Sequence, residues 1–230
     1  MPRTARQSRP QLICVLADNS GSMFGPKAKA ATDGIREMLM RCQSQGPRGP
    51  ERSYFRFVLI QFGTRAEVDP RCNMTPVRQI DPETIEVRGS GGGTNITEAL
   101  ELAYSGLQKY MREVVEPHSQ RSEHPLPLVL LFSDGQNGHG DPVPMAQKIK
   151  ALNIDGEAVV IACAGVATDN SDQPDENLLR AIASPECYLR IAHAEMLSAF
   201  LAEVGSSGVS TAHGIGGLMR QVAIRRGTED

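Results

Sequence analysis

The sequence lacks any uninterrupted apolar run close to the roughly 20 residues that a membrane-spanning helix requires. Its basic N-terminal segment also lacks the apolar stretch of a secretory signal, so we expect residues 1–10 to form a flexible arm. The formal net charge of −3 gives no reason to expect nucleic acid or an anionic membrane as a partner. These absences favour a soluble globular protein.

Closely spaced cysteine pairs are also missing. The chain has five cysteines, at positions 14, 42, 72, 163 and 187, and no C-x-x-C spacing. Zinc sites use tighter pairs, and disulfide scaffolds use more cysteine for their length. Cys14 and Cys163 fall inside apolar runs, where a free thiol packs as a small hydrophobic group. A reducing cytoplasm is therefore the expected compartment.

Short apolar runs alternate with segments of helical spacing. The runs that predict strands are 12–17, 54–62, 127–133, 157–165 and 187–192. The segments that predict helices are 27–43, 94–115 and three shorter ones in DPVPMAQKIKALN, NLLRAIAS and AEMLSAFLAEVG. Several runs are apolar nearly throughout, which is typical of a parallel sheet covered by helices on both faces.

Two regions depart from this alternation. No helical segment separates YFRFVLIQF from TRAEVDP, which predicts a hairpin with an antiparallel strand at the sheet edge. After a single domain at 11–205, the Ser- and Gly-rich SSGVSTAHGIGG predicts a linker. We expect residues 206–230 to form a partly disordered tail, or a weak helix or strand in LMRQVAIRRGTED that docks on the body or on a partner.

Three oxygen-rich loops lie where strands end or a helix begins: DNSGS, GSGGGTN at 89–95, and SDGQNGHGD at 133–141. In a doubly wound α/β sheet, ligands bind beyond the carboxyl ends of the strands. The loops supply two carboxylates and three hydroxyls, from Asp18, Ser20, Ser22, Thr94 and Asp134. Mg²⁺ prefers such hard oxygen ligands. Each loop alone also suits a helix cap, a phosphate site or a turn.

Taken in this order, D-N-S-G-S, G-G-T-N and S-D-G resemble the metal-ion-dependent adhesion site of von Willebrand factor type A (vWA) domains. The resemblance covers roughly residues 10–205. Within the family the sequence is most similar to bacterial tellurium-resistance-associated proteins called TerY-like. The resemblance implies a doubly wound, mostly parallel six-stranded sheet of order 3-2-1-4-5-6, with one antiparallel edge strand and flanking helices.

The resemblance also implies a role for each ligand. Ser20 and Ser22 would bind Mg²⁺ directly, with Mn²⁺ as the alternative ion, and Asp18 would act mostly through water. Thr94 and Asp134 would bind directly or through water. An Asp or Glu carboxylate of a protein partner would complete the coordination. The implied function is non-catalytic, metal-dependent docking.

For the TerY-like group, the resemblance implies a serine/threonine kinase and a PP2C-type phosphatase as partners, in a cytoplasmic bacterial stress-response or defence system. The residues expected on a partner-binding rim are Asn19, Met23, Phe24, Asn95, Gln136, Asn137 and His139. For Met23 and Phe24, packing beneath the start of the following helix is the alternative. For His139 a solvated loop histidine is the preferred interpretation, because no second ligand accompanies it.

Two other function classes compete. In a hydrolase, Ser20 or Ser22 would be the nucleophile and His139 the base, but N-S-G-S departs from the G-x-S-x-G elbow of α/β hydrolases. In a nucleotide-binding module, GSGGGTN would cradle phosphate. That segment lacks the P-loop lysine, because Thr94 and Asn95 follow the glycines where the motif G-K-[ST] requires Lys and then Ser or Thr. The acidic segment 169–177 suggests calcium, but it lacks the order of an EF-hand loop and is better suited to cap a helix.

Overall fold

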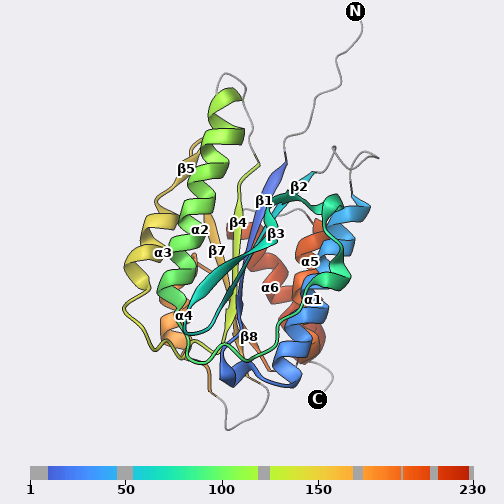
Figure 1. The fold of residues 1–230 in the computed structure, drawn as a ribbon, viewed down its shortest axis with the longest axis vertical. Coiled ribbons are helices and arrows are strands. Elements are labelled where there is room, and N and C mark those ends of the chain that lie inside the picture. Colours follow the sequence, from blue (N-terminus) through green and yellow to red (C-terminus); the bar gives the residue numbers. More distant parts are fainter. Residues whose placement is uncertain are drawn as a thin grey trace, which may run out of the picture.

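The computed structural model describes residues 10–45, 54–118, 125–167, 173–192, 194–207 and 212–227, so nearly all of the predicted N-terminal arm and residues 169–172 of the acidic segment lie outside it. The described chain forms a six-stranded sheet of order β3-β2-β1-β4-β7-β8 (Figure 1). Counted along the chain, this is the predicted order 3-2-1-4-5-6. The strands are β1 (Gln11–Asp18), β2 (Phe55–Phe62), β3 (Ala66–Pro76), β4 (Leu128–Ser133), β7 (Val160–Val166) and β8 (Tyr188–Ile191).

The pairing confirms a mostly parallel sheet with one antiparallel edge. Strand β1 lies parallel to β2 and β4, the pairs β4–β7 and β7–β8 are also parallel, and only β2–β3 is antiparallel. Every residue of β1, β4 and β7 is buried. Burial on both faces explains why these strands are continuous apolar runs in the sequence.

Helices cover both faces of the sheet (Figure 1). On one face lie α1 (Pro26–Ser44), α5 (Ala194–Ser207) and α6 (Ala212–Gly227), whose apolar side chains share one core with the sheet. On the other lie α2 (Ile96–Tyr110), α3 (Val143–Lys150) and α4 (Glu176–Ile182), which share a second core. None of the helices in the described ranges combines the length and the apolarity that crossing a bilayer requires.

The apolar run predicted as one strand at 157–165 is divided in the structure. Its first residues form β6 (Glu157–Ala158), which pairs with β5 (Asn153–Ile154) in a small separate hairpin. Asp155 and Gly156, both at positive φ, form the turn of this hairpin. The strand of the main sheet therefore begins only at Val160.

The C-terminal region differs from the predicted linker. Helix α6 begins at Ala212, so the glycine-rich AHGIGG is helical, and Ile215 and Met219 are buried in the core shared with α1 and α5. A glycine at position 216 permits this packing, because a Cβ there would lie 3.1 Å from the carbonyl oxygen of Glu186. An ion pair of 2.9 Å between Arg220 and Glu186 also joins α6 to the segment before β8. Helix α6 is thus docked on the body of the domain.

We predict that Ile215→Ala lowers the free energy of unfolding by about 2–5 kcal/mol, because Ile215 is fully buried in this core. Ile224→Ala on the same helix removes the same atoms from a side chain that is 65% exposed, and should change stability by less than about 0.5 kcal/mol. Urea unfolding of both variants provides the measurement. Equal effects of the two substitutions would contradict the docking of α6.

Candidate metal centre

The centre of the predicted site is a pair of carboxylates at the ends of two neighbouring strands. Strands β1 and β4 are parallel and pair Ala17 with Phe132, so Asp18 lies beside Ser133 and close to Asp134. Both Asp18 and Asp134 are 0% exposed. Both Asp18 oxygens accept hydrogen bonds, Oδ1 from the Ser20 backbone N–H at 2.8 Å and Oδ2 from the Ser133 hydroxyl at 2.5 Å.

Asp134 is less completely satisfied. Its Oδ1 accepts a hydrogen bond of 3.2 Å from the Gln136 backbone N–H, whereas its Oδ2 is buried without a hydrogen-bond partner among the described residues. Within the same ranges, no lysine or arginine forms an ion pair with Asp134 or Asp18. Buried polar atoms without partners are rare in folded proteins and costly. This oxygen therefore indicates a place for a cation.

The electrostatics of the pair agree with this interpretation. The pKa of Asp18 is raised to about 6, mainly by burial and to a smaller extent by the like charge of Asp134, although the hydrogen bonds from Ser133 and Ser20 oppose the shift. Two adjacent buried carboxylates repel each other and lose their hydration. A divalent cation would remove both penalties.

Three hydroxyls complete the set. The Ser20 hydroxyl is buried, that of Ser22 lies on an exposed residue, and the two Oγ atoms are 3.1 Å apart. Adjacent oxygens around one octahedral Mg²⁺ are separated by about 3 Å, given Mg–O distances of roughly 2.0–2.1 Å. Thr94 is buried at the start of α2, and the structure therefore brings all five predicted ligands to one edge of the sheet.

Backbone contacts place Thr94 between the other two loops. The Gly21 N–H donates to the carbonyl of Gly92 at 2.9 Å, and the Gly138 N–H donates to the carbonyl of Thr94 at 2.9 Å. The residues present thus fit a divalent cation held by hydroxyl and carboxylate oxygens. Groups of three or more His, Cys, Asp or Glu suited to a metal are absent from the described part of the chain.

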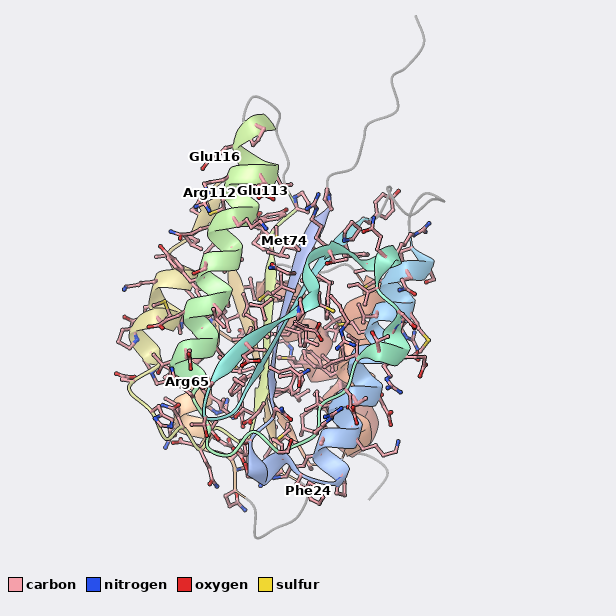
Figure 2. The ribbon with its side chains drawn as sticks, in the orientation of Figure 1. Phe24, Arg65, Met74, Arg112, Glu113 and Glu116 are labelled. Atoms are coloured by element: carbon pink, nitrogen blue, oxygen red, sulfur yellow. The ribbon has the colours of Figure 1, made fainter. Side chains whose placement is uncertain are left out.

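The predicted rim is only partly exposed. Phe24 is 74% exposed at the end of the molecule opposite Arg112 and Glu116 (Figure 2), and Gln136 and His139 are exposed as well. Met23 does not lie on the rim, because its side chain is fully buried in the core beneath α1. For Met23 the alternative of packing beneath the helix start is correct.

The three rim asparagines are engaged within the domain. Asn95 caps α2, with its side-chain oxygen accepting from the Glu98 N–H at 3.1 Å. The Asn19 side chain bonds to the loop at Arg88 and Gly89, and the Asn137 side chain bonds to the start of α2. Sequence reasoning missed these inward contacts, and it also missed Ser133, whose hydroxyl bonds Asp18. The S-D-G motif was the signal that could have pointed to Ser133.

Among the described residues, no hydrogen bond joins the His139 side chain to the Ser20 or Ser22 hydroxyl; the His139 Nε2 lies instead 3.7 Å from the position that a Cβ on Gly93 would occupy. The geometry therefore gives the hydrolase alternative no paired nucleophile and base.

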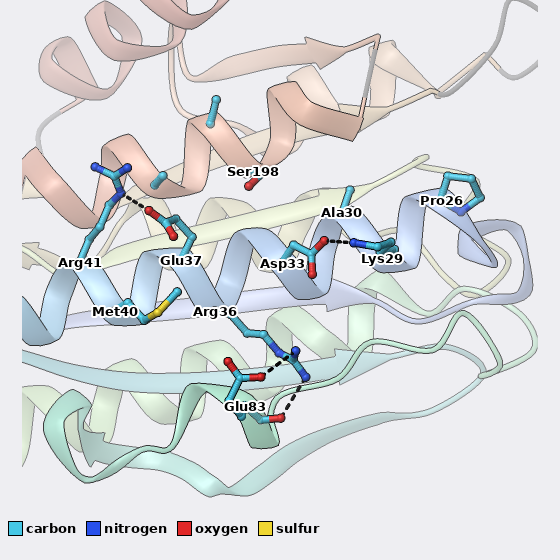
Figure 3. Close-up of a pocket in the computed structure, with 12 residues that line it drawn as sticks. Pro26, Lys29, Ala30, Asp33, Arg36, Glu37, Met40, Arg41, Glu83 and Ser198 are labelled. Carbon is cyan, nitrogen blue, oxygen red and sulfur yellow. Dashed lines mark hydrogen bonds and ion pairs between the residues drawn. The ribbon is translucent and has the colours of Figure 1, made fainter.

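A groove lies away from this site, along α1 and α5. Its volume is about 830 Å³, and its charged side chains form ion pairs with one another: Lys29 with Asp33, Arg36 with Glu83 and Arg41 with Glu37 (Figure 3). None of the five predicted metal ligands lines it. The groove is therefore separate from the candidate metal centre.

The comparisons with known proteins agree with this fold. The model of the von Willebrand factor type A domain matches residues 13–200. The chain belongs to the vWA domain family. No curated protein matches the sequence of this vWA domain significantly.

Several solved structures are similar to this vWA domain. Proximal thread matrix protein 1 from the mussel byssus, with a zinc-occupied MIDAS motif (a metal-ion-dependent adhesion site), is 21% identical with a TM-score of 0.58, over 89% of this chain and 49% of that one. The pilus adhesin SpaC of Lactobacillus rhamnosus GG is 15% identical with a TM-score of 0.60, over 87% and 30%. Manganese-loaded Plasmodium vivax TRAP is 17% identical with a TM-score of 0.56, over 89% and 76%.

The chain thus spans about half the length of the mussel protein and less of the pilus adhesin. At these identities the likeness establishes the fold.

We predict that the metal-free domain loses stability as the pH rises. The pKa of Asp18 is raised from 3.8 to about 6 in the folded state, so the folded state holds this proton more tightly than the unfolded chain does. The resulting stabilisation, roughly 2–3 kcal/mol, is present at acidic pH and is lost as the pH rises through about 6.

Urea unfolding in metal-free buffer at about pH 4.5 and about pH 7.5 measures this loss, with Asp18→Asn as the matched variant that cannot titrate. The wild type should lose more stability between the two pH values than the variant does. Parallel changes in both proteins would show that Asp18 does not titrate in this way.

Proposed function

We propose that this vWA domain is a non-catalytic, metal-dependent docking module for another protein. Its Mg²⁺ ion would be held by the set Asp18, Ser20, Ser22, Thr94 and Asp134. The observation that carries the proposal is the buried Asp134 Oδ2, which has no hydrogen-bond partner in the described chain and lies beside a second buried carboxylate. When bound, the ion supplies an electrophilic centre for one further anionic oxygen.

The ligands differ in their freedom to reach an ion. Both oxygens of Asp18 already accept hydrogen bonds, which suits contact through water and a role in orienting Ser20. The Ser20 and Ser22 hydroxyls bond to each other, and the Ser20 side chain also bonds to Asp18; both hydroxyls keep lone pairs that can face an ion. Mn²⁺ is the alternative ion, and the manganese-loaded Plasmodium structure supports testing it.

The partner group proposed for the ion is an Asp or Glu carboxylate. The two site carboxylates balance the charge of a divalent ion, which then remains attractive to one more anion. Ser22 is exposed, so the ion would be reached from the solvent side. Phe24, Gln136 and His139 are exposed on these loops and form the proposed partner-binding rim.

A finer proposal is that the domain belongs to the TerY-like group and acts in the bacterial cytoplasm as a scaffold for a serine/threonine kinase and a PP2C-type phosphatase in stress response or defence. Its support is the likeness of LADNSGSM, GGGTNITEAL and LLFSDGQNGHGDP to that group.

We predict that Mg²⁺ stabilises the wild type, by about 2.7 kcal/mol at a hundred times its dissociation constant. Ser22→Ala and Asp134→Asn should each weaken Mg²⁺ binding by at least about tenfold, because each removes an oxygen or a charge from the ion. Isothermal titration and thermal unfolding with Mg²⁺ measure both effects.

The matched control is Ser105→Ala, which removes an exposed hydroxyl on α2 outside the site. This variant should bind Mg²⁺ as the wild type does. A folded Ser22→Ala protein with unchanged Mg²⁺ affinity would count against the proposed ligand set.

We also predict that partner binding depends on the ion. The purified domain should retain a co-expressed kinase or phosphatase encoded beside its own gene, release it in excess EDTA, and regain it with Mg²⁺. Ser22→Ala should not retain the partner, because the exposed side of the ion site would be lost. Retention that survives both EDTA and this substitution would contradict docking through the ion.

A further inference from the structure

Asn19 joins the loop that carries Ser20 and Ser22 to the loop that carries Thr94. Its side-chain Oδ1 accepts two hydrogen bonds, from the Arg88 N–H at 2.9 Å and the Gly89 N–H at 2.7 Å. Its carbonyl accepts a third, from the Gly91 N–H at 2.6 Å. Asn19 therefore ties the segment that leads into Thr94 to the loop of Ser20 and Ser22.

Glycines at positions 89 and 91 allow the backbones of the two loops to approach closely. Gly89 has a φ of +65°, and a Cβ there would lie 2.5 Å from the backbone nitrogen of Phe24. A Cβ on Gly91 would lie 2.9 Å from the Asn19 carbonyl oxygen. Larger residues at these positions would push the two loops apart.

Asn137 makes the corresponding connection on the other side of Thr94. Its Oδ1 accepts a hydrogen bond of 3.1 Å from the N–H of Ile96, the first residue of α2. Its Nδ2 donates to the carbonyls of His139 at 3.0 Å and Gly140 at 2.8 Å. The loop that begins with Asp134 is thereby folded on itself and fixed to the helix start.

We infer that Asn19 and Asn137 are positioning residues that hold the three ligand loops in register before the ion binds. Neither is a proposed ligand; each secures a segment next to Thr94, Asn19 on the side of residues 88–91 and Asn137 on the side of Ile96. A site ordered in advance loses less conformational freedom on binding and therefore binds more tightly. This inference rests on the proposed function, because it assigns these residues to the same ion.

The two asparagines differ in a way that allows a sharp test. The Asn19 side chain acts as an acceptor, so the carboxylate of Asn19→Asp keeps both hydrogen bonds. The Asn137 side chain both accepts and donates, so Asn137→Asp loses the two donated bonds. Both changes add one negative charge near the ion, and each therefore controls for the charge of the other.

The experiment measures Mg²⁺ affinity by isothermal titration and amide hydrogen exchange of the metal-free proteins. Asn19→Ala, Asn137→Ala and Asn137→Asp should each weaken Mg²⁺ binding by about tenfold or more. Asn19→Asp should bind at least as tightly as the wild type. In the alanine variants, exchange should rise at residues 88–91 for Asn19 and at Ile96 for Asn137.

Asn153→Ala is the matched control, because Asn153 also bonds a backbone N–H, that of Gly156, in the β5–β6 hairpin outside the site. It should leave Mg²⁺ affinity unchanged. Alanine variants that exchange faster but bind Mg²⁺ as the wild type does would overturn the inference and leave the proposed function standing. A wild type that does not bind Mg²⁺ would overturn both, whatever the exchange data show.

Discussion

The structure around the site depends on two carboxylates that the parallel sheet forces together. Strands β1 and β4 are neighbours and end at the same edge of the sheet. Asp18 and Asp134 are therefore buried close together where these two strands end. Of their four oxygens, three accept hydrogen bonds within the described chain and Oδ2 of Asp134 does not. Such a pair has a high electrostatic cost unless a cation neutralises it.

The surrounding loops are built to bring backbones close to this pair. A Cβ on Gly63 would lie 2.3 Å from the Gly91 carbonyl oxygen, and the Thr64 N–H donates to that same carbonyl at 2.8 Å. Thr64 also accepts the Gly93 N–H through its hydroxyl, at 2.9 Å. Several backbone and side-chain contacts thus fix the segment that precedes Thr94. Ser22 remains exposed to solvent.

Much of the fold could be predicted because buried parallel strands leave continuous apolar runs and each ligand loop follows one or opens a helix. The side to which a loop residue turns could not be predicted. Met23 and Phe24 are neighbours in and after a short 3₁₀ turn, yet one is buried and the other exposed. Asn19 looks like a surface residue in the sequence, because its bonding partners lie about 70 positions away.

The glycine-rich start of helix α6 was predicted as a linker for a related reason. Its glycines are typical of linkers, and the packing of Gly216 against Glu186 becomes visible only when both segments are in place. The division of residues 157–165 between a hairpin and β7 depends on the turn at Asp155 and Gly156, which periodicity does not register.

The most direct test of the central claim is a crystal structure of the protein with Mn²⁺, in which anomalous scattering locates the ion. The account predicts one strong anomalous peak at the carboxyl ends of β1 and β4, within coordination distance of the Ser20 and Ser22 hydroxyls and beside Asp134. Ordered hydroxyls and carboxylates at saturating Mn²⁺ with no peak among them, or a peak only elsewhere, would contradict it.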